Sequence, residues 1–177
     1  MNHTEATTKL LDAAETLFYA HGVHAVGMDA LRAESGVSLK RLYQCFSSKD
    51  ELVEAYLRRR DGRWRGSLEA YVEARGNDPL AVFDWLHGWF SEPDFRGCAF
   101  VNSFGEFGDP SPGVAAAIRL HSGEVRRYLI GLTDEVLGDR LFTLLEGATV
   151  IAAITEDASV ALSSRETAAI LLTPQQL

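Results

Sequence analysis

A segment of 25 residues, from Gly27 to Glu51, most constrains what this chain can fold into. Its apolar residues form two short helical patterns separated by Ser35-Gly36-Val37, where Gly36 can adopt the positive φ of a tight corner. Ser38 is a favourable N-cap for the second pattern. That pattern has apolar residues at positions i, i+3, i+4 and i+7, namely Leu39, Leu42, Tyr43 and Phe46. The segment therefore predicts two short helices joined by a tight turn, the second with one buried face.

The opposite face of the second helix carries Lys40, Arg41 and Gln44, and between Ser35 and Lys49 there are three cations and no acid. Arginine can pair bidentately with guanine and glutamine with adenine, and the major groove admits a helix that displays such side chains. We therefore expect these three residues to read bases. The alternative is an ordinary helical bundle with cations on its surface.

Ser48-Lys49-Asp50-Glu51 is a capping-box pattern that predicts the start of a third helix, expected to end near Trp64. Lys49 lies at the N-terminus of this helix, where free backbone N–H groups favour a phosphate. An arginine-rich stretch, residues 58–65, follows. It is interpreted either as a phosphate-facing cluster or as a solvated surface, and the second interpretation is preferred.

Taken together, these residues resemble the DNA-binding helix-turn-helix of the TetR family of bacterial regulators. The matching residues follow the pattern GVSxxxLYxxFxSKDEL from Gly36 to Leu52, together with Gly22 and Leu31. The resemblance covers about the first third of the chain. It implies that Tyr43 and Lys49 hold phosphates, and the expected DNA-binding residues are Ser38, Lys40, Arg41, Tyr43, Gln44 and Lys49. Gly27 replaces the family's usual Ser or Thr, so that a hydroxyl contact with phosphate is lost.

The resemblance also implies an all-α fold with a helix-turn-helix head, residues 1–50, and a helical ligand-binding and dimerisation body, residues 51–177. It implies a repressor that binds a palindromic double-stranded DNA operator as a homodimer, and whose body binds a small-molecule effector. The last two helices of the chain would pair with their copies across the dimer axis as a four-helix bundle.

Two long helices are predicted in the second half of the body. The first has an apolar stripe from Val114 to Val136 and is expected to stop at Gly138. Asp139 is expected to open the second, whose apolar residues cover more than one face and predict burial on two sides. Ser163 and Glu166 form a further capping-box pattern, before a short final helix that ends near Leu172.

A dense group of aromatic residues lies between Trp85 and Phe107. One interpretation is an apolar ligand pocket with polar groups such as Asn102 and Glu106. The other is that aromatic residues at helical spacing form core. The residues expected to line the pocket are Trp85, Trp89, Phe100, Phe104 and His121, although a lone histidine on an apolar stripe is more often a core residue.

A different class of function is a metal-dependent helical-bundle enzyme. Asp84 and His87, and likewise His121 and Glu124, place a carboxylate and an imidazole on one helical face. The Glu-x-x-His order of carboxylate-bridged metal sites is absent. No GxSxG, Walker or GxGxxG motif occurs, so no cofactor and no catalytic residues are expected.

The distribution of charge and the cysteine content indicate which partners and which cellular compartment to expect. The net charge is −8, but residues 1–65 carry ten Lys and Arg against nine Asp and Glu, whereas the remainder carries seven against sixteen. An acidic body would repel DNA while a near-neutral head approaches it. Cys45 and Cys98 are far apart, which favours a reducing compartment. With no uncharged apolar run of membrane-spanning length and no signal-peptide pattern, a cytoplasmic location is expected and no membrane partner.

Overall fold

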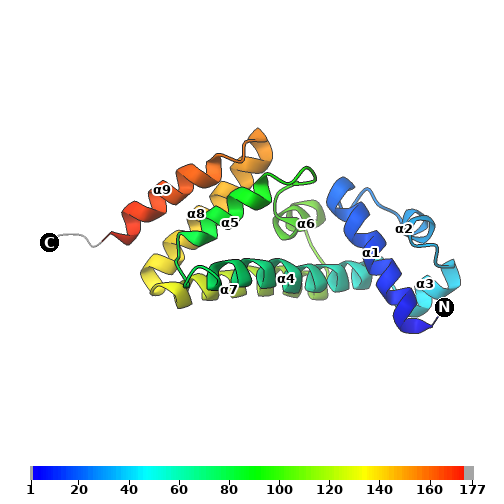
Figure 1. Cartoon of the computed structure of the whole chain (residues 1–177). Coiled ribbons are helices and arrows are strands. Elements are labelled where there is room, and N and C mark those ends of the chain that lie inside the picture. The colour runs from blue at the N-terminus through cyan, green and yellow to red at the C-terminus, as the bar shows by residue number, and fades with distance from the viewer. Residues whose placement is uncertain (1, 174–177) are drawn as a thin grey trace. The chain divides into compact units, whose positions relative to one another are not determined.

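The computed structural model describes residues 2–173, and every regular element in that range is an α-helix, as the sequence predicts. In chain order the helices are α1 (His3–His21), α2 (Met28–Ser35), α3 (Leu39–Cys45), α4 (Lys49–Glu73), α5 (Ala81–Phe90), α6 (Ala99–Phe107), α7 (Pro112–Leu132), α8 (Glu135–Thr155) and α9 (Val160–Leu172) (Figure 1). Among the described residues, no helix has both the length and the apolar character needed to cross a membrane.

The chain packs as two compact units, each with its own core. The head unit consists of the residues up to Gly62 together with Ala99–Leu120, and the body unit consists of Arg63–Cys98 and the residues from His121 onward. Helices α4 and α7 contribute residues to both units. The sequence-based division into residues 1–50 and 51–177 was drawn from a motif rather than from packing, and it remains a prediction.

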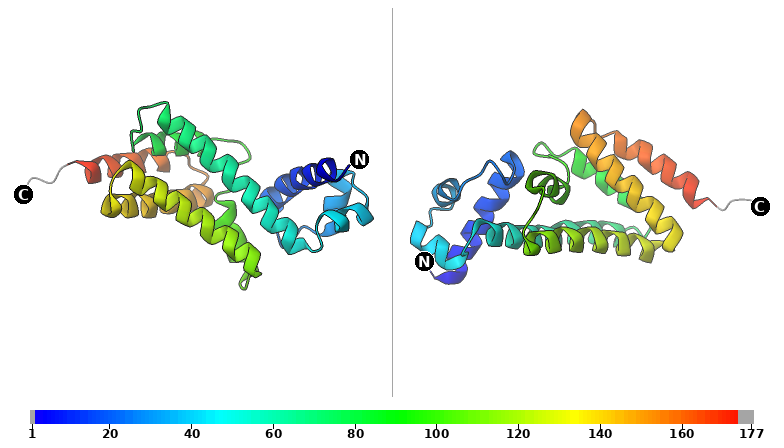
Figure 2. Two further views of the ribbon diagram at one scale, coloured as in Figure 1. Left: turned by 90° about the horizontal axis from the view of Figure 1, so that it is seen from below. Right: turned by 180° about the vertical axis from the view of Figure 1, so that it is seen from behind.

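The head unit is built on α1, which packs against α2 and α3 (Figure 2). Asn2 caps α1 by accepting a hydrogen bond from the Glu5 N–H at 2.8 Å. The side chains that α1 to α4 turn inward are fully or almost fully buried, and the largest are Leu10, Phe18, Leu31, Leu42, Leu52, Tyr56 and Leu57. Burial of such apolar side chains is the main favourable contribution to folding, so this core fixes the position of the short α2 and α3.

The body unit is held together by α5, α8 and α9, which lie beside one another and pack together (Figure 1). Its core also takes side chains from the second halves of α4 and α7. The buried apolar residues include Leu68, Val72, Phe83, Leu86, Leu129, Leu141 and Leu145. One apolar face of α8 is therefore buried within this unit.

The predicted boundary between the two long body helices is wrong. Helix α7 already ends at Leu132, and α8 is capped by Asp134, whose Oδ1 accepts from the N–H groups of Val136 and Leu137 at 2.9 Å. Gly138 consequently lies inside α8, where it is buried against Ile130. Glycine often marks the end of a helix because its helix propensity is low. At position 138, however, the glycine is explained by the close packing of α7 and α8.

Two other predicted helix limits differ from the structure. Helix α4 continues past Trp64 to Glu73, because Leu68 and Val72 are buried in the body core and hold the last turns in place. Helix α9 begins at Val160, so Ser163 and Glu166 lie within it and form no capping box. Its predicted end at Leu172 is correct.

Candidate nucleic-acid interface

The turn between α2 and α3 is fixed by three local interactions. Gly36 has φ +65° and ends α2, donating its N–H to the Arg32 carbonyl at 3.1 Å. The Val37 N–H donates to Ser35 Oγ at 3.3 Å, and the Val37 side chain is buried. Ser38 Oγ then accepts from the Arg41 N–H at 3.3 Å and caps α3. These interactions set the direction of α3, as the sequence predicts.

Helix α3 presents a polar face to solvent. Leu42 is fully buried, whereas Lys40, Tyr43 and Gln44 are exposed and Arg41 is half-buried. Two of the four residues predicted to face inward, Leu39 and Tyr43, are instead 43% and 49% exposed, so the buried face of this helix is narrower than predicted. Arg41 Nη1 donates to Gln44 Oε1 at 3.0 Å, so these two side chains form a pair on the helix surface. The predicted base-reading residues thus share one face, with Ser38 exposed at its N-terminal edge.

Helix α4 begins with the expected cap of Ser48 and Glu51, but the Glu51 side chain binds the backbone of Ser47 rather than that of Ser48. Ser48 Oγ accepts from the Glu51 N–H at 3.2 Å. The Glu51 carboxylate accepts from both the N–H and the hydroxyl of Ser47 at 2.7 Å, and these hydrogen bonds hold the pKa of Glu51 below its ordinary value. At the start of α2, by contrast, Gly27 provides no side-chain cap.

Lys49, predicted to bind a phosphate, is half-buried at the start of α4. Its ammonium donates to the His24 carbonyl at 3.5 Å, a long hydrogen bond. Partial burial lowers the pKa of Lys49, while the carboxylates of Glu106 and Asp50 act in the opposite direction. Lys49 therefore has partners inside the head unit, which the sequence did not indicate.

The arginine-rich stretch of α4 is largely paired with carboxylates. Arg59 Nη2 lies 2.8 Å from both Asp12 Oδ1 and Glu15 Oε2, and Arg60 Nη1 lies 3.5 Å from Glu15 Oε1. The Arg60 guanidinium also stacks on the Tyr19 ring, 3.8 Å from its centroid. These contacts join α1 to α4. They give this stretch a role in packing that neither sequence-based interpretation included.

The residues predicted to line a ligand pocket are divided between the two units. Trp85, Trp89 and His121 lie in the body unit around Trp64, with ring centroids 5.0, 5.5 and 5.2 Å from that ring. In the head unit, Phe100 is buried and Phe104 is 60% exposed. The prediction that these five residues line a ligand pocket stays untested.

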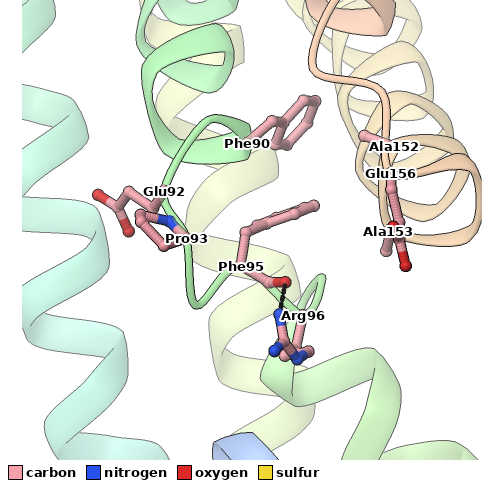
Figure 3. A pocket seen from close by; sticks show the side chains of 8 residues that line it. All are labelled: Phe90, Glu92, Pro93, Phe95, Arg96, Ala152, Ala153 and Glu156. Atoms are coloured by element: carbon pink, nitrogen blue, oxygen red, sulfur yellow. Dashed lines mark hydrogen bonds between the residues drawn. The ribbon is translucent and has the colours of Figure 1, made fainter.

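A cavity of about 560 Å³ lies elsewhere in the body unit (Figure 3). The rings of Phe90 and Phe95 point into it from α5 and the segment after it, with centroids 4.9 Å apart. Ala152 and Ala153 of α8 form the facing wall, and Glu156 ends that helix. Glu92, Pro93 and Arg96 complete the lining, and Arg96 Nη1 donates to the Phe95 carbonyl at 2.8 Å. Sequence reasoning missed this cavity, because it joins segments about 60 residues apart.

Three of the four residues considered for a metal site have other partners. Asp84 Oδ1 pairs with Arg165 Nε at 2.8 Å, and Glu124 Oε1 pairs with Arg127 Nη1. His121 is buried against Trp64. Within residues 2–173, no group of three or more His, Cys, Asp or Glu side chains is arranged to hold a metal ion.

Comparison with known proteins places this geometry in a family. Residues 10–56 match the family described as "Bacterial regulatory proteins, tetR family". A TetR-family transcriptional regulator from Streptomyces coelicolor, whose structure is solved, is 32% identical in sequence to this chain. The superposition has a TM-score of 0.83 and covers 96% of this chain and 95% of the Streptomyces chain.

Two further relatives are less complete or more distant. The transcriptional activator FasR of Mycolicibacterium smegmatis is 49% identical over 55 residues, which span 31% of this chain and only 25% of FasR. The multidrug-binding protein EbrR, solved with malachite green, is 16% identical with a TM-score of 0.78, covering 95% of this chain and 98% of its own, and shares the fold. The shared architecture thus extends over both units.

Proposed function

Because this chain belongs to the TetR family of bacterial transcriptional regulators, we propose that it is a repressor that binds a palindromic operator as a homodimer under the control of a small molecule. The observation that carries the proposal is the outer face of α3, where Lys40, Arg41 and Gln44 lie together next to a turn fixed by Gly36 and Ser38. The match to FasR spans only 31% of this chain and 25% of FasR, so the activator role of FasR does not set the sign of regulation proposed for this chain.

The Arg41–Gln44 pair suggests how bases are read. With Gln44 Oε1 accepting from Arg41, the pair presents mainly N–H donors to a groove. Guanine offers two acceptors, O6 and N7, on its major-groove edge. We therefore expect a guanine opposite Arg41, with Gln44 orienting the guanidinium, and Lys40 contacting a neighbouring acceptor.

Phosphate contacts would fix the register of α3 on the duplex. Ser38 and Tyr43 are exposed at the two edges of the polar face, and both can donate a hydroxyl hydrogen bond to a phosphate oxygen. Lys49 adds a cation at the start of α4. Such contacts carry no sequence information, so their loss would weaken binding to all sequences alike.

Exposed apolar side chains on α8 and α9 support the homodimer. Ile154 is 77% exposed and Ile170 is 67% exposed, and further large apolar side chains on these helices are open to solvent, namely Val136, Val150, Ile151 and Leu162. Transfer of apolar surface from water contributes about 25 cal/mol per Å², so a second copy of this chain would gain by covering them. A two-fold axis through this surface would make the operator an inverted repeat.

Selection of bound DNA from a random-sequence pool, with ligand-free protein at near-physiological salt, tests the proposal. We expect enrichment of one inverted repeat whose half-sites lie on the same face of the duplex, whole helical turns apart. Enrichment of a single half-site would contradict the dimer. No enrichment would contradict a repressor that binds its operator without ligand. Because such a regulator acts on chromosomal DNA, we propose a cytoplasmic location.

The effector would bind in the body. Supporting this, the cavity beside Phe90 and Phe95 has a size typical of small-molecule sites. Its aromatic rings face Ala152 and Ala153, and Glu92, Arg96 and Glu156 complete the lining, which favours a flat ligand that also carries polar groups. The multidrug-binding protein EbrR, which shares the fold, was solved in complex with malachite green. The ligand would control DNA binding only if it bound the DNA-competent and the incompetent conformations with different affinities.

Filling the cavity should abolish ligand binding without loss of fold. We expect compounds that raise the melting temperature of the wild-type protein in a thermal-shift screen to have no effect on Ala153→Trp, because the indole would occupy the slot opposite the phenyl rings. Thr143→Trp, at an exposed position of the same helix, is the matched control. Equal thermal shifts in both variants would place the effector elsewhere, for instance at the predicted Trp85, Trp89, Phe100, Phe104 and His121.

A further inference from the structure

A carboxylate of α6 is fixed to the backbone between α1 and α2, within the head unit. Glu106 Oε2 accepts from the His24 N–H at 2.7 Å, although the two residues are 82 positions apart. The carboxylate also lies against Gly22, where an added Cβ would be only 2.9 Å from both Glu106 oxygens. The close fit at Gly22 and the short hydrogen bond hold this negative charge in one place.

Lys49 reaches the same place from the start of α4. Its ammonium donates to the carbonyl of His24, the residue whose N–H is bound by Glu106. Both side chains line one cavity of about 260 Å³, together with Val23, His24, Asp50 and Phe107. The two side chains share this cavity without a direct salt bridge, and the fixed anion still attracts the ammonium, because partial burial reduces the screening by water.

We propose that Glu106 takes the place of a DNA phosphate for Lys49 in the free protein, so that DNA must withdraw this ammonium from the cavity before a phosphate can bind it. The proposal rests on the proposed function, since it assumes that Lys49 contacts DNA. Glu106 is then an autoinhibitory residue: its charge lowers the affinity for every DNA sequence, while the base preference set by α3 is unchanged. It also makes α6, outside the helix-turn-helix, part of the determinants of DNA affinity.

Glu106→Gln tests the proposal, because the amide oxygen can still accept from the His24 N–H while the charge is lost. We expect the affinity for the selected operator and for random duplex DNA to rise by the same factor, roughly two- to fivefold per subunit, the range of one exposed ion pair. The slope of log K against log salt should steepen by at most about 0.9 per subunit, because Lys49 then neutralises a phosphate in a larger fraction of the bound complexes. In a Lys49→Ala background the same substitution should change neither quantity.

Asp109→Asn is the matched control, since it removes the same charge from an exposed residue three positions further on. An equal gain in Asp109→Asn and Glu106→Gln would overturn the proposal in favour of net charge alone. The proposal would also be overturned if Glu106→Gln left the salt slope unchanged while Lys49→Ala made that slope shallower. If Lys49→Ala does not alter the wild-type slope, Lys49 binds no phosphate and the proposal fails, although DNA binding through α3 stands. If the wild-type protein binds no DNA, both fail.

Discussion

Replacing Gly138 by alanine is expected to lower the free energy of unfolding by about 3 kcal/mol, the upper part of the usual range for overpacking. A Cβ at this position would lie 2.6 Å from the Cα, the backbone nitrogen and Cγ1 of Ile130. Two of these atoms belong to the backbone of α7, so a change of side-chain rotamer cannot relieve the clash, and α7 and α8 must move apart. A loss of this size should lower the melting temperature by roughly 6–12 °C in a chain of this length.

Gly131→Ala is the matched control for Gly138→Ala. Gly131 is exposed in α7, directly after Ile130, and an added Cβ there meets no atom within 4 Å. Alanine is favoured over glycine inside a helix by up to about 1 kcal/mol, so this variant should be as stable as the wild type or more so. Melting curves followed by circular dichroism at one fixed protein concentration would compare the three proteins. Equal stability of both variants would show that the contact at Gly138 is not tight.

The same glycine shows where sequence reasoning reached its limit. The sequence predicts that Gly138 ends a helix, because glycine has a low helix propensity and an apolar stripe leads up to it. The actual boundary is marked by Asp134, which caps α8, and Val136, predicted to belong to that stripe, is 59% exposed in α8. The role of Gly138 depends on Ile130 of another helix, and a local pattern cannot reveal a contact between helices.

The helix-turn-helix was predictable because its determinants are local. The positive φ of Gly36, the Ser38 cap and the burial of Leu42 and Phe46 all depend on residues within one short segment. Glu106 is the opposite case. Nothing near it in the sequence indicates that it accepts a hydrogen bond from His24, since that contact joins residues 82 positions apart within the head unit. The cavity at Phe90 and Ala152 was missed for the same reason.

Arg41→Ala is expected to remove the preference for one base in each half-site of the operator. A good bidentate contact of arginine with guanine contributes about 1–3 kcal/mol of discrimination against a wrong base. In a symmetric dimer the contact occurs twice, so changing that base in both half-sites should weaken wild-type binding by about 2–6 kcal/mol and leave binding of the variant nearly unchanged. The measurement is the affinity for the selected operator and for that doubly substituted operator, at one salt concentration.

Two further variants separate base recognition from charge. Arg32→Ala removes an exposed arginine of α2 that pairs with Asp29, so it should retain the base preference while losing the same charge.

Gln44→Ala leaves Arg41 without the partner that holds its guanidinium at 3.0 Å. If Gln44 orients Arg41, this variant should lose part of the preference at the same base pair, and adding Gln44→Ala to Arg41→Ala should cost little more, since contacting residues are not additive. Loss of preference at a different base pair would instead identify Gln44 as an independent base reader. An unchanged preference in Arg41→Ala would show that the bases are read by other residues of α3.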